Sequence, residues 1–168
     1  MATGFNHHAD RWLAGIALAC IAAVGAALVS QHVFDMQPCP WCVLQRVIFL
    51  AVAIACVIGL LWRSRSGRRV GTSLGLLLAL CGIAAALWQH FQAAASASCN
   101  LTLADKIVSR WLQLDQLLPD VFEARASCAD AAVSLLGVSY DFWSLALFGL
   151  IAAALLTLLR APRRSSAA

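Results

Sequence analysis

Apolar residues fill four long stretches of this sequence, and most of the polar side chains lie in the segments between them. The apolar stretches cover about residues 12–33, 43–62, 71–91 and 143–160. Each is long enough to cross the roughly 30 Å of hydrocarbon in a bilayer, which takes about 20 residues of helix. Because backbone groups in lipid must be hydrogen-bonded within their own segment, each stretch should be helical. The pattern predicts an all-α membrane protein, with the whole chain forming one bundle of four transmembrane helices.

The composition supports lipid rather than water as the solvent of this chain. Hydrophobic residues make up 62% and charged residues 12% of the sequence, and the mean hydropathy is +0.82. A soluble domain usually carries about 25% charged residues. The net charge of +4 comes from arginines beside the apolar stretches, which form no basic face on a soluble domain, so nucleic acid is excluded as a partner.

The basic residues predict how the bundle is oriented. One set of helix ends carries eight of the twelve: Arg11, Arg63, Arg65, Arg68, Arg69, Arg160, Arg163 and Arg164. The opposite loops, 34–42 and 93–142, carry only Lys106, Arg110 and Arg125. Since positive residues stay in the cytoplasm, both termini and the 63–70 segment should be cytoplasmic. The loops 34–42 and 93–142 should lie outside.

The long outer loop contains one segment with a helical apolar pattern, from Asp105 to Leu118. Its apolar residues fall mostly on one helical face: Ile107, Val108, Trp111, Leu114, Leu117 and Leu118. Pro119 limits its far end. The pattern predicts a short helix lying flat on the outer membrane surface, with packing against the bundle as the alternative.

The seven cysteines fall into two groups. Three lie near the middle of predicted spans: Cys20, Cys56 and Cys81. A free cysteine in such a place behaves as a small, inert apolar residue. The other four lie in the two outer loops: Cys39, Cys42, Cys99 and Cys128. An even number of cysteines in an oxidising compartment indicates disulfide chemistry.

The segment Cys39-Pro40-Trp41-Cys42 is a Cys-x-x-Cys motif just ahead of the second span. Two thiols this close exchange a disulfide easily, and the amino terminus of the following helix favours a thiolate at Cys42. Zinc is disfavoured because Cys99 and Cys128 are too far apart for a second zinc knuckle. Covalent haem attachment requires a histidine where this chain has Val43. A pair of purely structural bridges remains the alternative.

Arg46 lies one turn into the second span, four residues after Cys42. A charge in the apolar zone is costly and usually has a partner or a function. The spacing puts both residues on one helix face, where the guanidinium could stabilise a thiolate or an anionic ligand. The alternative is an arginine that reaches out to the lipid headgroups.

Further hydrogen-bonding residues end the predicted helices at the same depth. Gln31 and His32 end the first span, Gln89 and His90 end the third, and Gln45 precedes Arg46. Such a group could hold the carbonyls of a quinone whose tail lies in the bilayer. For each histidine the alternative is a solvated residue at the membrane interface.

With these residues placed, the chain resembles the DsbB family of bacterial disulfide-forming membrane proteins. The resemblance covers nearly the whole chain and rests on a combination of features: four helices, Gln31-His32, Pro38-Cys39-x-x-Cys42, Arg46, Gln89-His90, Cys99, Trp111-Leu112-Gln113-Leu114-Asp115, Pro119-Asp120-Val121-Phe122, Cys128 and Trp143. It implies a multi-pass protein of the bacterial inner membrane, with the redox cysteines and a long loop carrying a short surface helix in the periplasm.

The resemblance also implies a route for electrons. Cys99 would be attacked by a reduced, DsbA-like periplasmic thiol oxidase, giving a mixed disulfide that Cys128 resolves. Cys128 would exchange with Cys39, leaving Cys42 as a thiolate beside a membrane quinone, either ubiquinone or menaquinone. The implied function is to reoxidise the periplasmic partner and to pass the electrons to quinone.

The implied quinone contacts are led by Arg46, with His90 as a helper and with Gln45, Gln31 and His32 nearby. The chain departs from the family at Gln45, where an acidic residue is expected, and in the uncommon Cys-Pro-Trp-Cys filling of the motif. Two other readings compete: a quinone reductase of the vitamin K epoxide reductase type, and a structural tetraspan protein with inert disulfides. The first is disfavoured because the Cys-x-x-Cys of that family lies late in the chain, whereas here it follows the first span.

Overall fold

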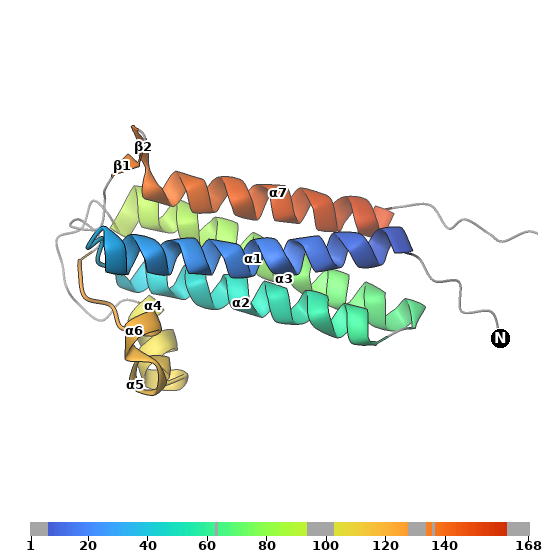
Figure 1. Cartoon of the computed structure of the whole chain (residues 1–168), viewed down its shortest axis with the longest axis horizontal. Coiled ribbons are helices and arrows are strands. Elements are labelled where there is room, and N and C mark those ends of the chain that lie inside the picture. Colours follow the sequence, from blue (N-terminus) through green and yellow to red (C-terminus); the bar gives the residue numbers. More distant parts are fainter. Residues whose placement is uncertain (1–6, 63, 94–102, 128–133, 136, 161–168) are drawn as a thin grey trace, which may run out of the picture.

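A computed structural model describes residues 7–62, 64–93, 103–127, 134–135 and 137–160. Four long helices dominate it: α1 (His7–Val33), α2 (Pro40–Leu61), α3 (Arg65–Trp88) and α7 (Tyr140–Arg160). They lie side by side, and the first turn of α1 and the last turn of α7 are at the same end (Figure 1). All four are long and apolar enough to cross a membrane, which confirms the predicted all-α membrane fold.

The helices begin several residues before the apolar stretches that predicted them. At the start of α3, the Ser64 side chain caps the helix by accepting a hydrogen bond from the backbone N–H of Gly67 at 2.9 Å. Near the start of α1, Asp10 pairs with Arg68 of α3 at 3.2 Å. Polar first turns of this kind extend a helix beyond its hydrocarbon-crossing part, which is why hydropathy alone places the boundaries too late.

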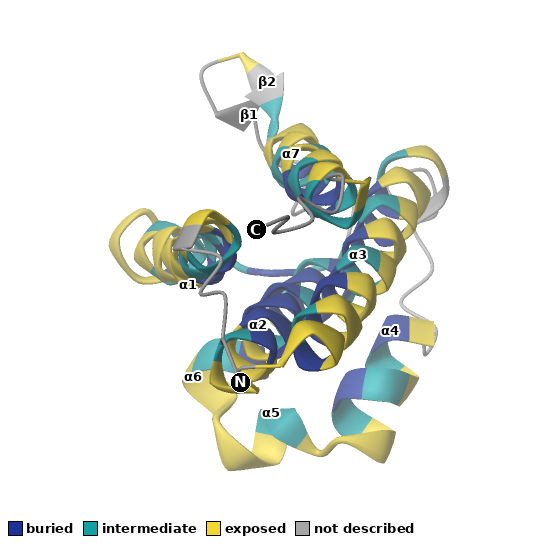
Figure 2. Ribbon diagram, turned by 90° about the vertical axis from the view of Figure 1, so that its right-hand side faces the viewer, coloured by how far each residue is buried: buried dark blue, intermediate teal, exposed yellow. Residues whose placement is uncertain are grey.

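Helix α2 is the most buried of the four, and α3 packs closely against it (Figure 2). Glycines allow this approach: a Cβ at Gly71 would lie 2.7 Å from the Ala55 carbonyl oxygen and from the Gly59 Cα. Further along α3, Gly82 leaves room for the Phe148 ring of α7. The Phe148 ring stacks on Phe49 of α2 with 3.9 Å between centroids.

The three cysteines of the spans occupy two environments. Cys20 of α1 and Cys56 of α2 are fully buried in the core, whereas Cys81 of α3 is exposed on the outside of the bundle. Helices α1 and α7 scarcely touch each other. The bundle is therefore tightly packed around α2 and open between α1 and α7.

Residues 103–122, here called the outer segment, fold against the end of α2 as short pieces (Figure 1): α4 (Leu103–Asp105), a π-helical turn η2 (Lys106–Trp111), α5 (Leu114–Leu117) and α6 (Pro119–Phe122). The prediction of one continuous helix from Asp105 to Leu118 is wrong, because Gln113 adopts a left-handed conformation with φ of 50° and interrupts it.

The apolar residues of this segment do not share one environment either. Val108 is buried with Ala104 and Phe122 against Trp41 of α2, whereas Trp111 is 78% exposed. Part of the segment thus packs against the bundle, which was the alternative to a surface-lying helix.

A small antiparallel hairpin leads from the outer segment into α7. Its strands are β1 (Ser134–Leu135) and β2 (Val138–Ser139). Gly137 in the turn has a φ of 79°, a conformation that glycine adopts without strain. The sequence pattern did not predict this hairpin.

Candidate functional site

The Cys-x-x-Cys pair sits at the amino terminus of α2. Cys39 is the N-cap residue, and its sulfur accepts a hydrogen bond from the backbone N–H of Cys42 at 3.4 Å. Pro40 occupies the first helical position, where its fixed φ suits the helix and no N–H is needed. The two sulfurs are 3.0 Å apart. Cys39 is fully buried and Cys42 is half-buried, so Cys42 is the accessible member of the pair.

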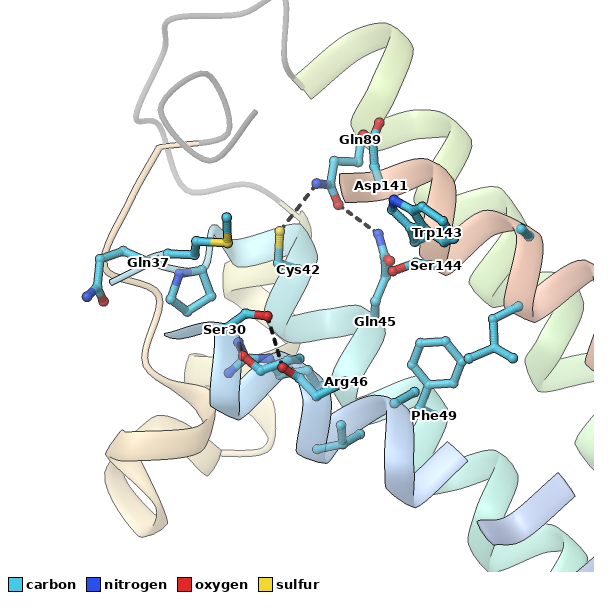
Figure 3. Close-up of a pocket in the computed structure, with 18 of the residues that line it drawn as sticks. Ser30, Gln37, Cys42, Gln45, Arg46, Phe49, Gln89, Asp141, Trp143 and Ser144 are labelled. Atoms are coloured by element: carbon cyan, nitrogen blue, oxygen red, sulfur yellow. Dashed lines mark hydrogen bonds between the residues drawn. The ribbon is translucent and has the colours of Figure 1, made fainter. Parts of the chain in front are cut away.

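Two glutamines lie beside the Cys42 sulfur: Gln45 of α2, and Gln89 of the π-helical turn η1 (Gln89–Ala93), which continues α3. The Gln89 side-chain amide donates to the Cys42 sulfur at 3.3 Å. The Gln45 amide donates to the Gln89 carbonyl oxygen at 2.7 Å (Figure 3). Both glutamines are buried. The sulfur therefore faces a hydrogen-bond donor whose orientation is set by a second amide.

Arg46 is 6% exposed, so it does not extend out to the lipid headgroups. Its guanidinium donates to the Gln31 side-chain oxygen at 2.7 Å, to the Val121 carbonyl at 2.8 Å and to the Ala27 carbonyl at 3.5 Å. These acceptors come from α1 and from α6. A buried charge of this kind is tolerated because several groups satisfy its donors.

A cavity of about 500 Å³ opens beside these residues, between α1, α2 and α7. Cys42, Gln45, Arg46 and Gln89 give it a polar end (Figure 3). Most of the remaining lining is apolar and includes Ala23, Val24, Ala27, Phe49, Trp143, Leu147 and Leu150. A mostly apolar cavity with donors at one end suits a ligand with a polar head and an apolar tail.

The structure places the other predicted site residues at different distances from this cavity. Gln31 is buried behind Arg46, donates to the Asp120 carbonyl at 3.2 Å and does not belong to the lining. His32 is exposed. His90 lies outside the lining, but its Nδ1 is 2.7 Å from a carboxylate oxygen of Asp141, which does line the cavity. Cys99 and Cys128 lie outside the described residues.

Two site residues were missed or undervalued by sequence reasoning. Gln89 is in contact with the reactive sulfur, although the sequence identified it only as one of several polar residues at this depth. Asp141 gave no signal beyond being an acidic residue at the start of an apolar stretch. Its pairing with His90, 51 residues away, arises only when α7 is packed against η1 at the end of α3.

Residues just after α6 are hydrogen-bonded to the backbone beside the cysteine pair. The backbone N–H groups of Arg125 and Ala126 donate to the Pro38 carbonyl at 3.1 and 3.3 Å. Pro38 directly precedes Cys39. The segment that leads toward Cys128 is therefore fastened beside the Cys-x-x-Cys pair.

Four helices of membrane-spanning length, with a Cys-x-x-Cys pair at the rim of an apolar cavity, define a multi-pass membrane protein of thiol–disulfide chemistry. The chain belongs to the DsbB family, since the family model for disulfide bond formation protein DsbB matches residues 9–158. This family forms disulfide bonds, and the resemblance found in the sequence is thereby confirmed.

Individual relatives agree with the family assignment. Disulfide bond formation protein B of Herminiimonas arsenicoxydans is 32% identical over 86% of this chain and 90% of its own length. The protein of the same name from Pseudomonas syringae pv. tomato is 37% identical over 84% of each chain. Disulfide bond formation protein B 1 of Pseudomonas savastanoi pv. phaseolicola is 38% identical, again over 84% of each chain.

Proposed function

We propose that this protein reoxidises a DsbA-like periplasmic thiol oxidase and passes the electrons to a membrane quinone. The observation that carries the proposal is that Cys42, Arg46 and Gln89 meet at the polar end of an otherwise apolar cavity that reaches in among the membrane-spanning helices. A dithiol pair at that position can exchange disulfides outward and transfer electrons inward.

The proposed electron route uses four cysteines. The partner's dithiol reduces a Cys99–Cys128 disulfide through a mixed disulfide on Cys99, and Cys128 then exchanges with Cys39. The fastening of Arg125 and Ala126 to Pro38 supports the second exchange, because Ser127 directly follows them and directly precedes Cys128. Cys42 is then released as the thiolate that faces the cavity.

The cavity residues fit a quinone. A quinone supplies an acceptor for two electrons and two protons, and its carbonyl oxygens accept hydrogen bonds. Arg46, Gln45 and Gln89 are donors at the polar end, and the apolar lining suits an isoprenoid tail. In this proposal Arg46 stabilises both the thiolate and the quinone oxygen, since its charge is held in a buried, low-dielectric site. Ubiquinone and menaquinone share this chemistry.

The remaining predicted contacts act from further away. Gln31 holds the Arg46 guanidinium in place, and His90 reaches the cavity through Asp141. His32 is assigned only the solvated rim. The proposed location is the bacterial inner membrane, with both termini cytoplasmic and the cysteines periplasmic, which the clustering of arginines at the opposite helix ends supports.

Trapping of the mixed disulfide tests the outward reaction. With Cys128→Ala, the Cys99 thiolate can displace one sulfur of the disulfide of an oxidised DsbA-like partner, and the resulting mixed disulfide should accumulate because Cys128 is absent and cannot displace the partner from Cys99. Non-reducing electrophoresis of the full-length protein with the partner measures this adduct. The matched control, Cys99→Ala with Cys128→Ala, should give none. A well-expressed Cys128→Ala protein that forms no adduct would instead indicate a scaffold with inert disulfides.

Arg46→Ala tests the inward reaction. Loss of the guanidinium should slow quinone reduction by about 10²-fold, the lower part of the range for a preorganised donor, while the disulfides still form. The measurement is the loss of quinone absorbance with purified protein and a dithiol donor. Arg68→Ala removes an arginine from the other end of the bundle and is the control. Equal rates for Arg46→Ala and the parent would remove Arg46 from the proposed site.

A further inference from the structure

We propose that Gln89 is a positioning residue that stabilises the Cys42 thiolate, and that Gln45 controls it by fixing which end of the Gln89 amide faces the sulfur. The proposal rests on the proposed function only in taking Cys42 as the reactive thiolate. It adds a role toward the sulfur for two residues that the proposed function uses only as hydrogen-bond donors at the polar end of the cavity.

The argument begins with the direction of the two hydrogen bonds. An amide has donors on its nitrogen and acceptors on its oxygen. Because Gln45 donates to the Gln89 oxygen at 2.7 Å, the Gln89 nitrogen is directed at the Cys42 sulfur, 3.3 Å away. A sulfur anion accepts hydrogen bonds, and a bond to a charged group is stronger than one between neutral groups. The observed direction therefore favours the thiolate.

The opposite direction would favour the thiol. If both amides turned over, the Gln89 carbonyl would face the sulfur and could only accept a hydrogen bond from S–H. Glutamine at both positions allows the pair to reverse together, so the bond between the two amides is kept in either direction. Glutamate at position 45 would remove this freedom, because a carboxylate accepts from the Gln89 nitrogen and turns the Gln89 carbonyl toward the sulfur. Glutamine rather than glutamate at position 45 is thus what permits the thiolate-stabilising direction.

A purely structural role for the pair would consist of satisfying two buried amides between α2 and α3. Such a role would be insensitive to the direction of the amides, provided that each is bonded. The two interpretations therefore differ in the reactivity of Cys42 and need no quinone to be separated.

The experiment measures alkylation of Cys42 by iodoacetamide in the reduced full-length protein in detergent, without quinone or partner, with fragment-ion mass spectrometry assigning the site. Only the thiolate reacts. With Gln89→Met we expect alkylation to slow about tenfold at neutral pH, and to be unchanged at strongly alkaline pH, where the thiol is deprotonated in every variant. Thr157→Ala, which removes a hydroxyl of α7 outside the cavity lining, is the control and should match the parent at both pH values.

A double-mutant cycle tests the control by Gln45. Gln45→Glu should slow alkylation strongly when Gln89 is present, and much less in the Gln89→Met background, where charge remains but no amide can be turned. Equal slowing in both backgrounds would show that charge alone acts and would overturn the role of Gln45. Gln89→Met that reacts like the parent at neutral pH, or is slowed equally at both pH values, would overturn the role of Gln89.

Gln89→Glu provides a second test if the methionine variant does not fold. Its carboxylate can still accept from Gln45, but it presents an oxygen to the sulfur, so alkylation at neutral pH should again be slower than in the parent. A rate equal to that of the parent would contradict the proposal. If the parent protein reduced quinone slowly but its Cys42 were alkylated rapidly at neutral pH, that result would count against the proposed function. It would leave the inference about Gln89 and Gln45 standing.

Discussion

The bundle is packed differently on two sides of α2. Near the Asp10–Arg68 pair, α2 and α3 approach so closely that a Cβ on Gly71 would meet the backbone of α2. On the side that faces α1 and α7, a cavity of about 500 Å³ lies against the same α2 near the cysteine pair. The difference arises from the residues that face α2. Glycine on α3 permits contact of the backbones, whereas the separation of α1 from α7 leaves the small side chains of α1 unpartnered.

This contrast separates the residues that hold the fold from those that carry the chemistry. Around Gly71 and Phe148, tight packing supplies the dispersion contacts that hold helices together in lipid. Around Arg46, the polar groups satisfy one another and leave space for a ligand. A bulky substitution should therefore affect stability where α2 contacts α3, and function where α2 faces the cavity.

The largest effect is expected from Gly71→Ala, at the contact between α2 and α3. The new Cβ would lie 2.7 Å from the Ala55 carbonyl oxygen and from the Gly59 Cα, and backbone atoms cannot move aside at little cost. We expect a loss of about 3 kcal/mol, at the upper end of the usual cost of overpacking. Thermal unfolding in detergent measures it. Gly149→Ala of α7 has no atom within 4 Å of the added Cβ and should be neutral or slightly stabilising.

Ala23→Phe, at the cavity, should give the opposite result: it should weaken quinone binding and leave the stability unchanged. Ala23 lines the cavity, so the ring would fill space that the proposed quinone tail requires. We expect the KM for quinone to rise about tenfold, equivalent to about 1.4 kcal/mol of binding, with the melting temperature unchanged. A lower melting temperature with an unchanged KM would show that the residues around the cavity, like those between α2 and α3, serve only to pack the helices.

A smaller effect is expected from Asp141→Asn. Asp141 pairs with His90 and lies in the first turn of α7, where a negative charge is favourable. The asparagine keeps a hydrogen bond but loses the charge, so we expect a loss of about 1 kcal/mol in the free energy of unfolding.

Asp10→Asn removes a carboxylate near the start of α1, at the opposite end of the bundle from Asp141. Its pair with Arg68 is partly exposed, and such pairs contribute about 0–1 kcal/mol. The effect of Asp10→Asn should therefore be the smaller of the two. A larger loss for Asp10→Asn than for Asp141→Asn would mean that the contact between His90 and Asp141 does not help to hold α7 in place.

The sequence alone determined the four helices, because an apolar stretch of membrane-spanning length has one stable backbone conformation in lipid. It also determined the Cys39–Cys42 pair at a helix amino terminus, since the motif, Pro40 and the following apolar stretch are contiguous. Both features depend on neighbours along the chain. They could be predicted without knowing how the helices pack.

Only the tertiary structure decided which polar residues surround the reactive sulfur. Gln45 and Gln89 are 44 residues apart, and Arg46 is 75 residues from the Val121 carbonyl that it contacts. Such contacts depend on the rotation and axial shift of whole helices, which hydrophobic patterning leaves open. The break of the outer segment at Gln113 belongs to the same class, because burial of Val108 and Phe122 against Trp41 outweighs the local preference for one continuous helix.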